Sequence, residues 1–349
     1  MTSPAPQVPD SAGIAAGQRP LPPVSQVRPG IWSIPVPLPN TSLRYVLVYV
    51  FETDAGPYLV DAGWDTDEAF DTLAAGLAGV GTRIEDVQGV LVTHVHPDHY
   101  GLAGRVRAAS GAWISLHPAD ADVLSWLDDA DLVRDNLAML RNAGAPQEVL
   151  ERQRRRLRAL DMFGNSPRPD VLMEDGARPD VPGWELSAIW TPGHSPGHLC
   201  FWEPRHRLML TGDHVLPRIT PNVPAPRDDE ADPLGDFLRS LDRLAGRGAC
   251  EVLPAHERRF TDLDGRLEAL RHHHDKRFAE VLSALEAGAD VAWDVAAHMH
   301  WSRPWQQMEG LAQQAAVGEA SAHLRALARR GVVREERGEP ARWRLMERS

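Results

Sequence analysis

The segment Thr93–His99 (THVHPDH) constrains the fold of this chain more than any other, because it follows directly on the apolar run Val90–Val92. Four side chains able to bind a metal ion lie within six residues: His94, His96, Asp98 and His99. Alternation along an extended backbone turns the first two histidines to the same side. The turn at Pro97 then presents the aspartate and the third histidine to a neighbouring point. The segment therefore predicts a metal site at the end of a buried strand.

Further metal-binding side chains follow apolar strands elsewhere in the chain. They are His194 in TPGHSPGH, Asp213 in TGD and His256 in LPAH, and Asp61 ends a strand in the same way. Binding residues commonly lie in loops that a rigid sheet positions. Isolated histidines are usually core or surface residues, but that interpretation does not explain ligand-type side chains at four separate strand ends. Imidazole and carboxylate suit zinc, with iron or manganese as alternatives.

The ordered set of these residues resembles the five motifs of the metallo-β-lactamase superfamily, over roughly residues 28–262. The resemblance implies an α/β fold, the αββα sandwich of that family. It also implies two zinc ions per chain, with a bridging water or hydroxide as the nucleophile. The implied ligands are His94, His96 and His194 for one ion, Asp98, His99 and His256 for the second, and Asp213 between them.

The same resemblance assigns roles to two aspartates. Asp61 corresponds to a residue that orients a ligating histidine from behind. Asp98 would bind through one oxygen and orient the nucleophile with the other, which makes it the candidate catalytic residue. His198 and His214 lie beside the metal motifs, and we expect structural roles for both.

The chain divides into a tail, an α/β region and a C-terminal module. Residues 1–25 are rich in Pro and Ala and predict a disordered tail. Strands alternate with helices over 26–263, which predicts a layered catalytic domain, and two helices inserted at 119–160 would form a wall of the active site. Residues 264–349 predict three helices, the third over about 318–330, and a hairpin. This pattern is typical of a winged-helix module.

The combination resembles the glyoxalase II-like or β-lactamase-like branch of the superfamily, which includes an RNA endonuclease and polyketide-type thioesterases. Charge separates these functions. Residues 265–349 hold 13 Lys and Arg against 12 Asp and Glu, which leaves 24 against 37 in residues 1–264. An acidic catalytic domain disfavours nucleic acid. We therefore expect a small-molecule carbonyl substrate, a thioester or lactone, and we expect the C-terminal module to shape the active site or a homodimer.

Other functions of the same fold remain as alternatives. They are an endoribonuclease or phosphodiesterase, and a persulfide dioxygenase with a single iron. The lactonases of the family usually carry a tyrosine well beyond the His-rich motif, whereas all four tyrosines here lie before that motif or directly against it.

Three further features concern surroundings and surface. No apolar run is long enough to span a membrane. The N-terminus lacks a secretory pattern and only two cysteines occur, so we expect a cytoplasmic protein. The run His272–His274 lies on a predicted helix, where consecutive side chains point about 100° apart and cannot converge on one ion. We interpret that run as surface.

Overall fold

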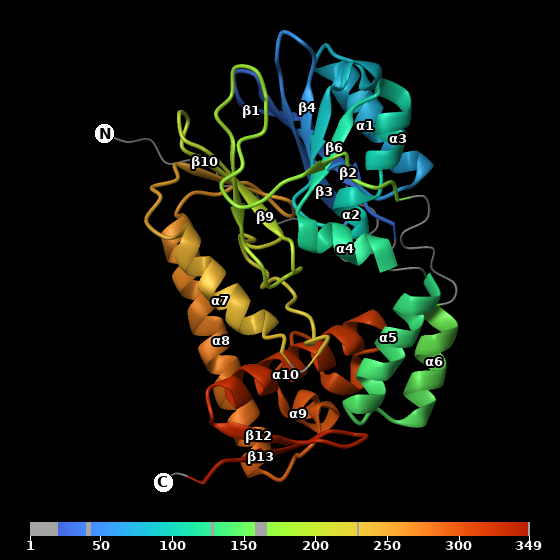
Figure 1. Ribbon diagram of the computed structural model, residues 1–349, viewed down its shortest axis with the longest axis vertical. Helices are drawn as coiled ribbons and strands as arrows, with labels where there is room; N and C mark the ends of the chain where they lie inside the picture. The colour runs from blue at the N-terminus through green and yellow to red at the C-terminus, as the bar shows by residue number, and fades with distance from the viewer. Residues whose placement is uncertain (1–19, 40–42, 127–128, 158–165, 229, 348–349) are drawn as a thin grey trace.

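The computed structural model describes residues 20–39, 43–126, 129–157, 166–228 and 230–347. Its upper half in Figure 1 contains two β-sheets that pack face to face. The first sheet has seven strands in chain order, antiparallel from β1 to β4 and parallel from β4 to β7. They are β1 (Ser25–Arg28), β2 (Ile31–Pro37), β3 (Tyr45–Phe51), β4 (Tyr58–Val60), β5 (Gly89–Leu91), β6 (Trp113–Leu116) and β7 (Val171–Leu172).

The second sheet has four strands in the order β11-β10-β9-β8, of which only β10 and β11 run parallel. They are β8 (Ser187–Trp190), β9 (Leu199–Glu203), β10 (Leu208–Gly212) and β11 (Glu251–Pro254). Helices cover the outer face of each sheet. Before the second sheet lie α1 (Asp67–Gly79), α2 (Pro97–Tyr100), α3 (Ala103–Ser110), α4 (Pro118–Trp126), α5 (Asp129–Asn142) and α6 (Gln147–Leu157), with a 3-10 turn η1 (Ile84–Asp86).

The remaining helices follow β10 in the chain. They are α7 (Pro233–Leu244), α8 (Leu263–Glu286), α9 (Ala292–His298) and α10 (Leu311–Arg329), with a 3-10 turn η2 (Trp305–Gln307) before α10. The hairpin β12 (Val333–Glu336) and β13 (Arg342–Leu345) closes the described chain. Over the described residues, no helix combines the length and the apolar character that crossing a membrane requires.

Strand β3 shows why the sheets stack in layers, because both of its faces are buried. Alternate side chains of a strand point to opposite faces. Three valines therefore enter the core under α1 and α3, and three larger side chains face the second sheet: Val46, Val48 and Val50 on one side, Leu47, Tyr49 and Phe51 on the other. A third core joins the second sheet to α7 and α8. The predicted αββα sandwich is confirmed.

The C-terminal elements match the prediction with shifted bounds. Three helices and a hairpin are present, but the third helix starts at Leu311 rather than near residue 318. The insert contains three helices rather than two, although residues 127–128 and 158–165 lie outside the described part. Most of the predicted tail, residues 1–19, also lies outside it, and β1 begins at Ser25.

Helices α5 and α6 pack against the C-terminal elements at the bottom of Figure 1, away from the first sheet. Leu140 and Leu150 share the core that contains α9 and α10. The backbone N–H of Trp293 donates to the carbonyl of Ala143, and Ala341 N–H donates to Asn142 in the same way. We call α5, α6, α9, α10 and the hairpin the helical lobe.

Candidate metal centre

Each predicted metal-binding side chain lies just beyond the end of a strand, at one edge of the sandwich. Asp61 follows β4, His94 follows β5, and His194 lies in the loop from β8 to β9. Asp213 and His256 follow the parallel strands β10 and β11. Since the sheets pack face to face, their strand ends deliver these side chains to one place.

The first group consists of His94, His96 and His194, whose ring nitrogens lie within 4.8 Å of one another. His94 Nε2 is 2.9 Å from His96 Nδ1 and 3.2 Å from His194 Nε2. His94 is fully buried, and His194 is 6% exposed. The sequence prediction of a three-histidine group is matched by this geometry.

The second group consists of Asp98, His99 and His256. Asp98 Oδ1 is 3.6 Å from His99 Nε2, and its Oδ2 is 3.3 Å from His256 Nε2. Asp213 spans both groups: its Oδ2 is 3.6 Å from the Nε2 atoms of both His99 and His194, and its Oδ1 is 3.2 Å from His256 Nε2. The structure thus brings all seven predicted ligands together.

The spacing and the unsatisfied atoms of the centre fit metal ions. Ligands about 2.1 Å from a tetrahedral zinc ion lie roughly 3.4 Å from one another, and the separations here run from 2.9 to 3.6 Å. Three buried atoms also have no hydrogen-bond partner: His99 Nε2, His256 Nε2 and Asp213 Oδ1. Buried polar atoms without partners are costly in a folded protein. Divalent cations at these two points would satisfy them.

Fixed acceptors orient three of the histidines with Nε2 toward the centre. The Nδ1–H groups of His194 and His256 donate to the carbonyls of Asn222 (2.7 Å) and Tyr45 (2.9 Å). His94 Nδ1 lies 3.0 Å from Thr93 Oγ1. Because a carbonyl oxygen only accepts, the proton of His194 and His256 is held on Nδ1. Nε2 is left as the ligand atom, as in most metal-binding histidines.

Asp61 lies behind the centre, where the resemblance placed it. Its Oδ2 accepts from His99 Nδ1 at 2.8 Å and from the Thr93 hydroxyl at 3.0 Å, while Oδ1 accepts from the Thr93 N–H at 2.8 Å. Its backbone has a φ of 63°, in the left-handed region that non-glycine residues seldom occupy. The side chain thereby fixes both the ring of His99 and the start of the His-rich loop.

The pKa shifts of the histidines differ between the two groups of the centre. Burial lowers the pKa of His94 well below its usual value and lowers that of His96 to about 3, so both rings are neutral. Burial also disfavours an imidazolium at His256, but Asp213 and Asp98 outweigh it and raise its pKa to about 10. The carboxylates thus hold protons on nearby imidazoles when no cation is present. Metal ions and protons therefore compete for the same atoms.

Asp120 is a site residue that the sequence analysis missed. Its Oδ2 accepts from Val95 N–H (2.9 Å) and the Ser195 hydroxyl (2.8 Å), and its Oδ1 accepts from Gly197 N–H (2.6 Å). Burial raises its pKa to about 6, against these hydrogen bonds. A Cβ on Gly197 would lie 2.6 Å from the Asp120 backbone nitrogen, so only glycine allows this approach. Asp120 ties the loop of His94 and His96 to the loop of His194.

His198 and His214 are fully buried beside the centre. His198 Nδ1 lies 2.9 Å from Thr191 Oγ1, and its Nε2 accepts from the Asp213 backbone N–H at 3.2 Å. Neither nitrogen of His214 has a partner, and its ring packs against Phe237. Both contacts agree with the structural roles predicted for these histidines.

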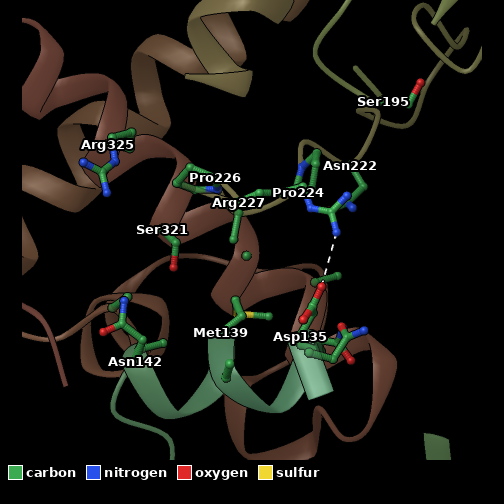
Figure 2. Close-up of a pocket in the computed structure, with 18 of the residues that line it drawn as sticks. Asp135, Met139, Asn142, Ser195, Asn222, Pro224, Pro226, Arg227, Ser321 and Arg325 are labelled. Atoms are coloured by element: carbon green, nitrogen blue, oxygen red, sulfur yellow. Dashed lines mark hydrogen bonds and ion pairs between the residues drawn. The ribbon is translucent and has the colours of Figure 1, made fainter. Parts of the chain in front are cut away.

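A pocket of about 780 Å³ opens beside the first group, where His96 and His194 form part of its wall. It continues between α5, the loop at 222–227 and α10 (Figure 2). Its volume lies within the roughly 300–1,000 Å³ of small-molecule sites. The predicted wall from the helical insert is present in α5, but α10 forms the facing side.

The family model of the metallo-beta-lactamase superfamily matches residues 41–256, which contain all eight residues discussed above: Asp61, His94, His96, Asp98, His99, His194, Asp213 and His256. The chain belongs to this superfamily and is a metal-dependent hydrolase.

Relatives of known sequence and structure agree with this membership. The chain is 26% identical over 279 residues to a probable metallo-hydrolase, YqjP, of Bacillus subtilis, covering 75% of this chain and 82% of that protein. It is 32% identical over 121 residues to the lactamase-like protein adaB of Aspergillus niger, covering 34% of this chain and 36% of that protein.

Two solved structures are similar over nearly the whole chain. A metallo-beta-lactamase family protein, TTHA1429, of Thermus thermophilus aligns with a TM-score of 0.76 at 30% identity, over 92% of this chain and all of that one. A beta-lactamase domain protein of Burkholderia ambifaria aligns with a TM-score of 0.80 at 24% identity, over 96% and 97% of the two chains. The similarity therefore extends through the helical lobe.

Proposed function

We propose that this chain is a dinuclear zinc-dependent hydrolase of a small carbonyl substrate, a thioester or lactone. The observation that carries the proposal is the pair of three-residue groups with Asp213 3.6 Å from a histidine of each, and with ligand-type atoms at zinc-like separations. His94, His96 and His194 would hold one ion, and Asp98, His99 and His256 the other. When bound, the two ions would lower the pKa of a water molecule to about 7 and polarise the substrate carbonyl.

The protein's own residues would position the reacting groups. Asp98 presents one oxygen to each neighbouring imidazole and is ionised, because His99 and His256 overcome the effect of burial and lower its pKa to about 2. One of its oxygens would accept a hydrogen bond from the nucleophilic water. Asp120 and Asp61 would keep the ligand loops fixed, so that the site needs no reorganisation during the reaction.

The two histidines beside the centre are not placed as general acids, which favours a thioester. Among the described residues, His198 uses both ring nitrogens and His214 is buried against Phe237, so neither faces the pocket. A thiolate leaves without prior protonation more easily than an amine, because a thiol has a pKa of only about 8.5. This argument favours a thioester over a β-lactam.

The tyrosines favour a thioester over a lactone. The hydroxyls of Tyr45, Tyr49 and Tyr100 donate to the backbone carbonyls of Glu257, Pro254 and Pro167. Tyr58 packs against Trp113 and is not among the residues that line the pocket beside the first group. None of these four tyrosines is therefore placed to contact a substrate carbonyl.

Elemental analysis and a substrate screen test the proposal. Protein purified without added metal should contain zinc at a ratio near two per chain. It should cleave acyl thioesters faster than lactones, β-lactams or single-stranded RNA. A single tightly bound iron would contradict the proposed hydrolase and indicate a persulfide dioxygenase. RNA cleavage without thioesterase activity would indicate a nuclease.

A further inference from the structure

Helix α10 has two faces with different neighbours. One face packs into the core of the helical lobe through Val317, Ala320, Leu324 and Leu327. The opposite face lines the pocket through Leu311, Gln314, Ala315, Gly318, Ser321 and Arg325. These six recur at helical spacing, so they form one continuous stripe. We call this stripe the pocket face of α10.

Helix α5 lies across the pocket from this stripe. Figure 2 shows Asp135, Met139 and Asn142 along α5, facing Ser321 on α10. Side-chain amides hold the two helices at a fixed separation: Gln314 donates to Asn136 of α5 and accepts from Gln153 of α6. The insert and the C-terminal module thus enclose one space.

The pocket connects this space to the metal centre. The loop at 222–227 runs along its upper side, where Asn222 accepts from His194 and Pro224, Ala225 and Pro226 line the wall. Gly318 approaches this loop closely, since a Cβ on it would lie 3.5 Å from the Ala225 nitrogen. A substrate bound at the centre can therefore extend along α10.

Charges along the pocket are paired. Arg227 lies 3.3 Å from Asp135, and Arg325 lies 3.0 Å from Glu335. The other lining side chains on α5 and α10 are apolar or neutral. Such a lining matches an uncharged, mainly apolar group, because a carboxylate already offsets the charge of each arginine.

We propose that the pocket face of α10 and the facing side of α5 bind the acyl part of the substrate, an uncharged and mainly apolar group too long for the metal centre alone. This inference rests on the proposed hydrolysis of a carbonyl substrate. It gives the C-terminal module a role in substrate selection. The module resembles a winged helix, whose third helix would insert into duplex DNA. Here the outer face of that helix is covered by α5 and the 222–227 loop.

Gly318 allows a matched test, because a Cβ there meets open space apart from the contact with Ala225. Gly318→Ala should leave the pocket open and favour the helix, whereas Gly318→Leu should fill it. The substrates are acetyl and decanoyl thioesters of N-acetylcysteamine. We expect Gly318→Leu to reduce kcat/KM for the decanoyl thioester by at least about tenfold, since each excluded methylene contributes about fourfold. Turnover of the acetyl thioester should change by less than about twofold, because it does not reach α10.

Ser321 provides a second pair should Gly318→Leu fail to fold. Its hydroxyl donates only to Val317 within α10, so Ser321→Phe should block the pocket and Ser321→Ala should not. Equal effects on the two thioesters, or no effect on either, would overturn the assignment.

A binding measurement separates this inference from the proposed function. The probe is the decyl thioether of N-acetylcysteamine, which has no thioester carbonyl to hydrolyse, and calorimetry reports its affinity. Binding to the wild type and to Gly318→Ala, with at least about tenfold weaker binding to Gly318→Leu, supports the acyl site even if no thioester is cleaved. No binding to the wild type, or equal binding to all three proteins, overturns it.

Discussion

Buried histidines gather at two places in this molecule, the metal centre and the packing of α8 against α10. In the second place His274 and His323 are both buried, with His274 Nδ1 3.1 Å from His323 Nε2. His323 Nδ1–H donates to the Glu319 carbonyl. The His274 ring packs against Phe237, and no third ligand-type atom joins the pair among the described residues.

The comparison shows what distinguishes a metal centre from a polar contact in a core. At the centre, carboxylates raise the pKa of His256 to about 10 despite burial. At the pair, burial and the neighbouring ring lower the pKa of His274 to about 3, and burial lowers that of His323 to about 4. Convergence of several imidazoles with carboxylates on shared points, rather than burial of imidazole, therefore distinguishes the candidate metal centre from the pair.

Removing the shared carboxylate should have the largest effect. We expect Asp213→Ala to lower turnover by more than about 10³-fold, because Asp213 lies within 3.6 Å of both ligand groups. Zinc content should also fall. Steady-state kinetics and elemental analysis measure the two effects, and His274→Leu is the control that should keep turnover within about twofold. Near-normal turnover by Asp213→Ala would contradict the ligand assignment.

A positioning residue should have a smaller effect on the same centre. Asp120→Asn replaces an acceptor oxygen with an amide that cannot accept from Val95, Ser195 and Gly197 together. We expect turnover and zinc affinity at the first group to fall by about 10- to 100-fold. Competition with a chelator measures the affinity. If turnover fell while zinc affinity stayed unchanged, Asp120 would act on the substrate instead of the loops.

The positions of the candidate ligands could be predicted from the sequence because these residues follow apolar strands. The apolar runs before His94, Asp213 and His256 are local signals. Asp120 gave no such signal, since an aspartate in the first turn of a helix is common for electrostatic reasons alone. The contact of Asn136 with Gln314 joins residues far apart in the chain, so the enclosure of the pocket depends on tertiary packing.

The interpretation of His272–His274 as surface was wrong for His274. That residue is 1% exposed, because it shares the buried face of α8 with Leu267, Leu270 and Phe278. Their spacing places His274 on the same helical stripe. The apolar periodicity of the whole helix predicts that His274 is buried, whereas the run of three histidines by itself does not.

The buried pair should affect stability without affecting chemistry. His274→Leu leaves the Nε2 of His323 without its donor, and we expect the free energy of unfolding to fall by about 1–3 kcal/mol. Replacing both histidines with leucine should recover part of this loss, because no unpaired partner remains. Denaturant titration measures the difference. A large loss of zinc from either variant would show that the two places are not independent.

The smallest expected effect is a pH dependence of stability. Both histidines have lowered pKa values in the folded state, so the unfolded chain binds more protons as the pH falls below about 6.5. The contribution of the two neutral histidines to stability is complete above that pH and is lost as the pH falls toward their folded-state pKa values. The charged and titratable groups around them include Glu319, Arg277 and His273. Between pH 7 and 6, the wild type should lose about 0.7 kcal/mol of unfolding free energy for each of the two histidines. The double leucine variant should lack this loss. An equal loss in both proteins would contradict the assignment.

The loop at 222–227 contacts both the metal centre and the pocket. One end holds the ring of His194 through the Asn222 carbonyl, and the other end lines the pocket. A ligand that fixes this loop in place also fixes the histidine, so it should tighten metal binding. Linkage is reciprocal, and the metal should then tighten ligand binding by the same factor. The protein would therefore select its substrate and retain its metal through one cooperative segment.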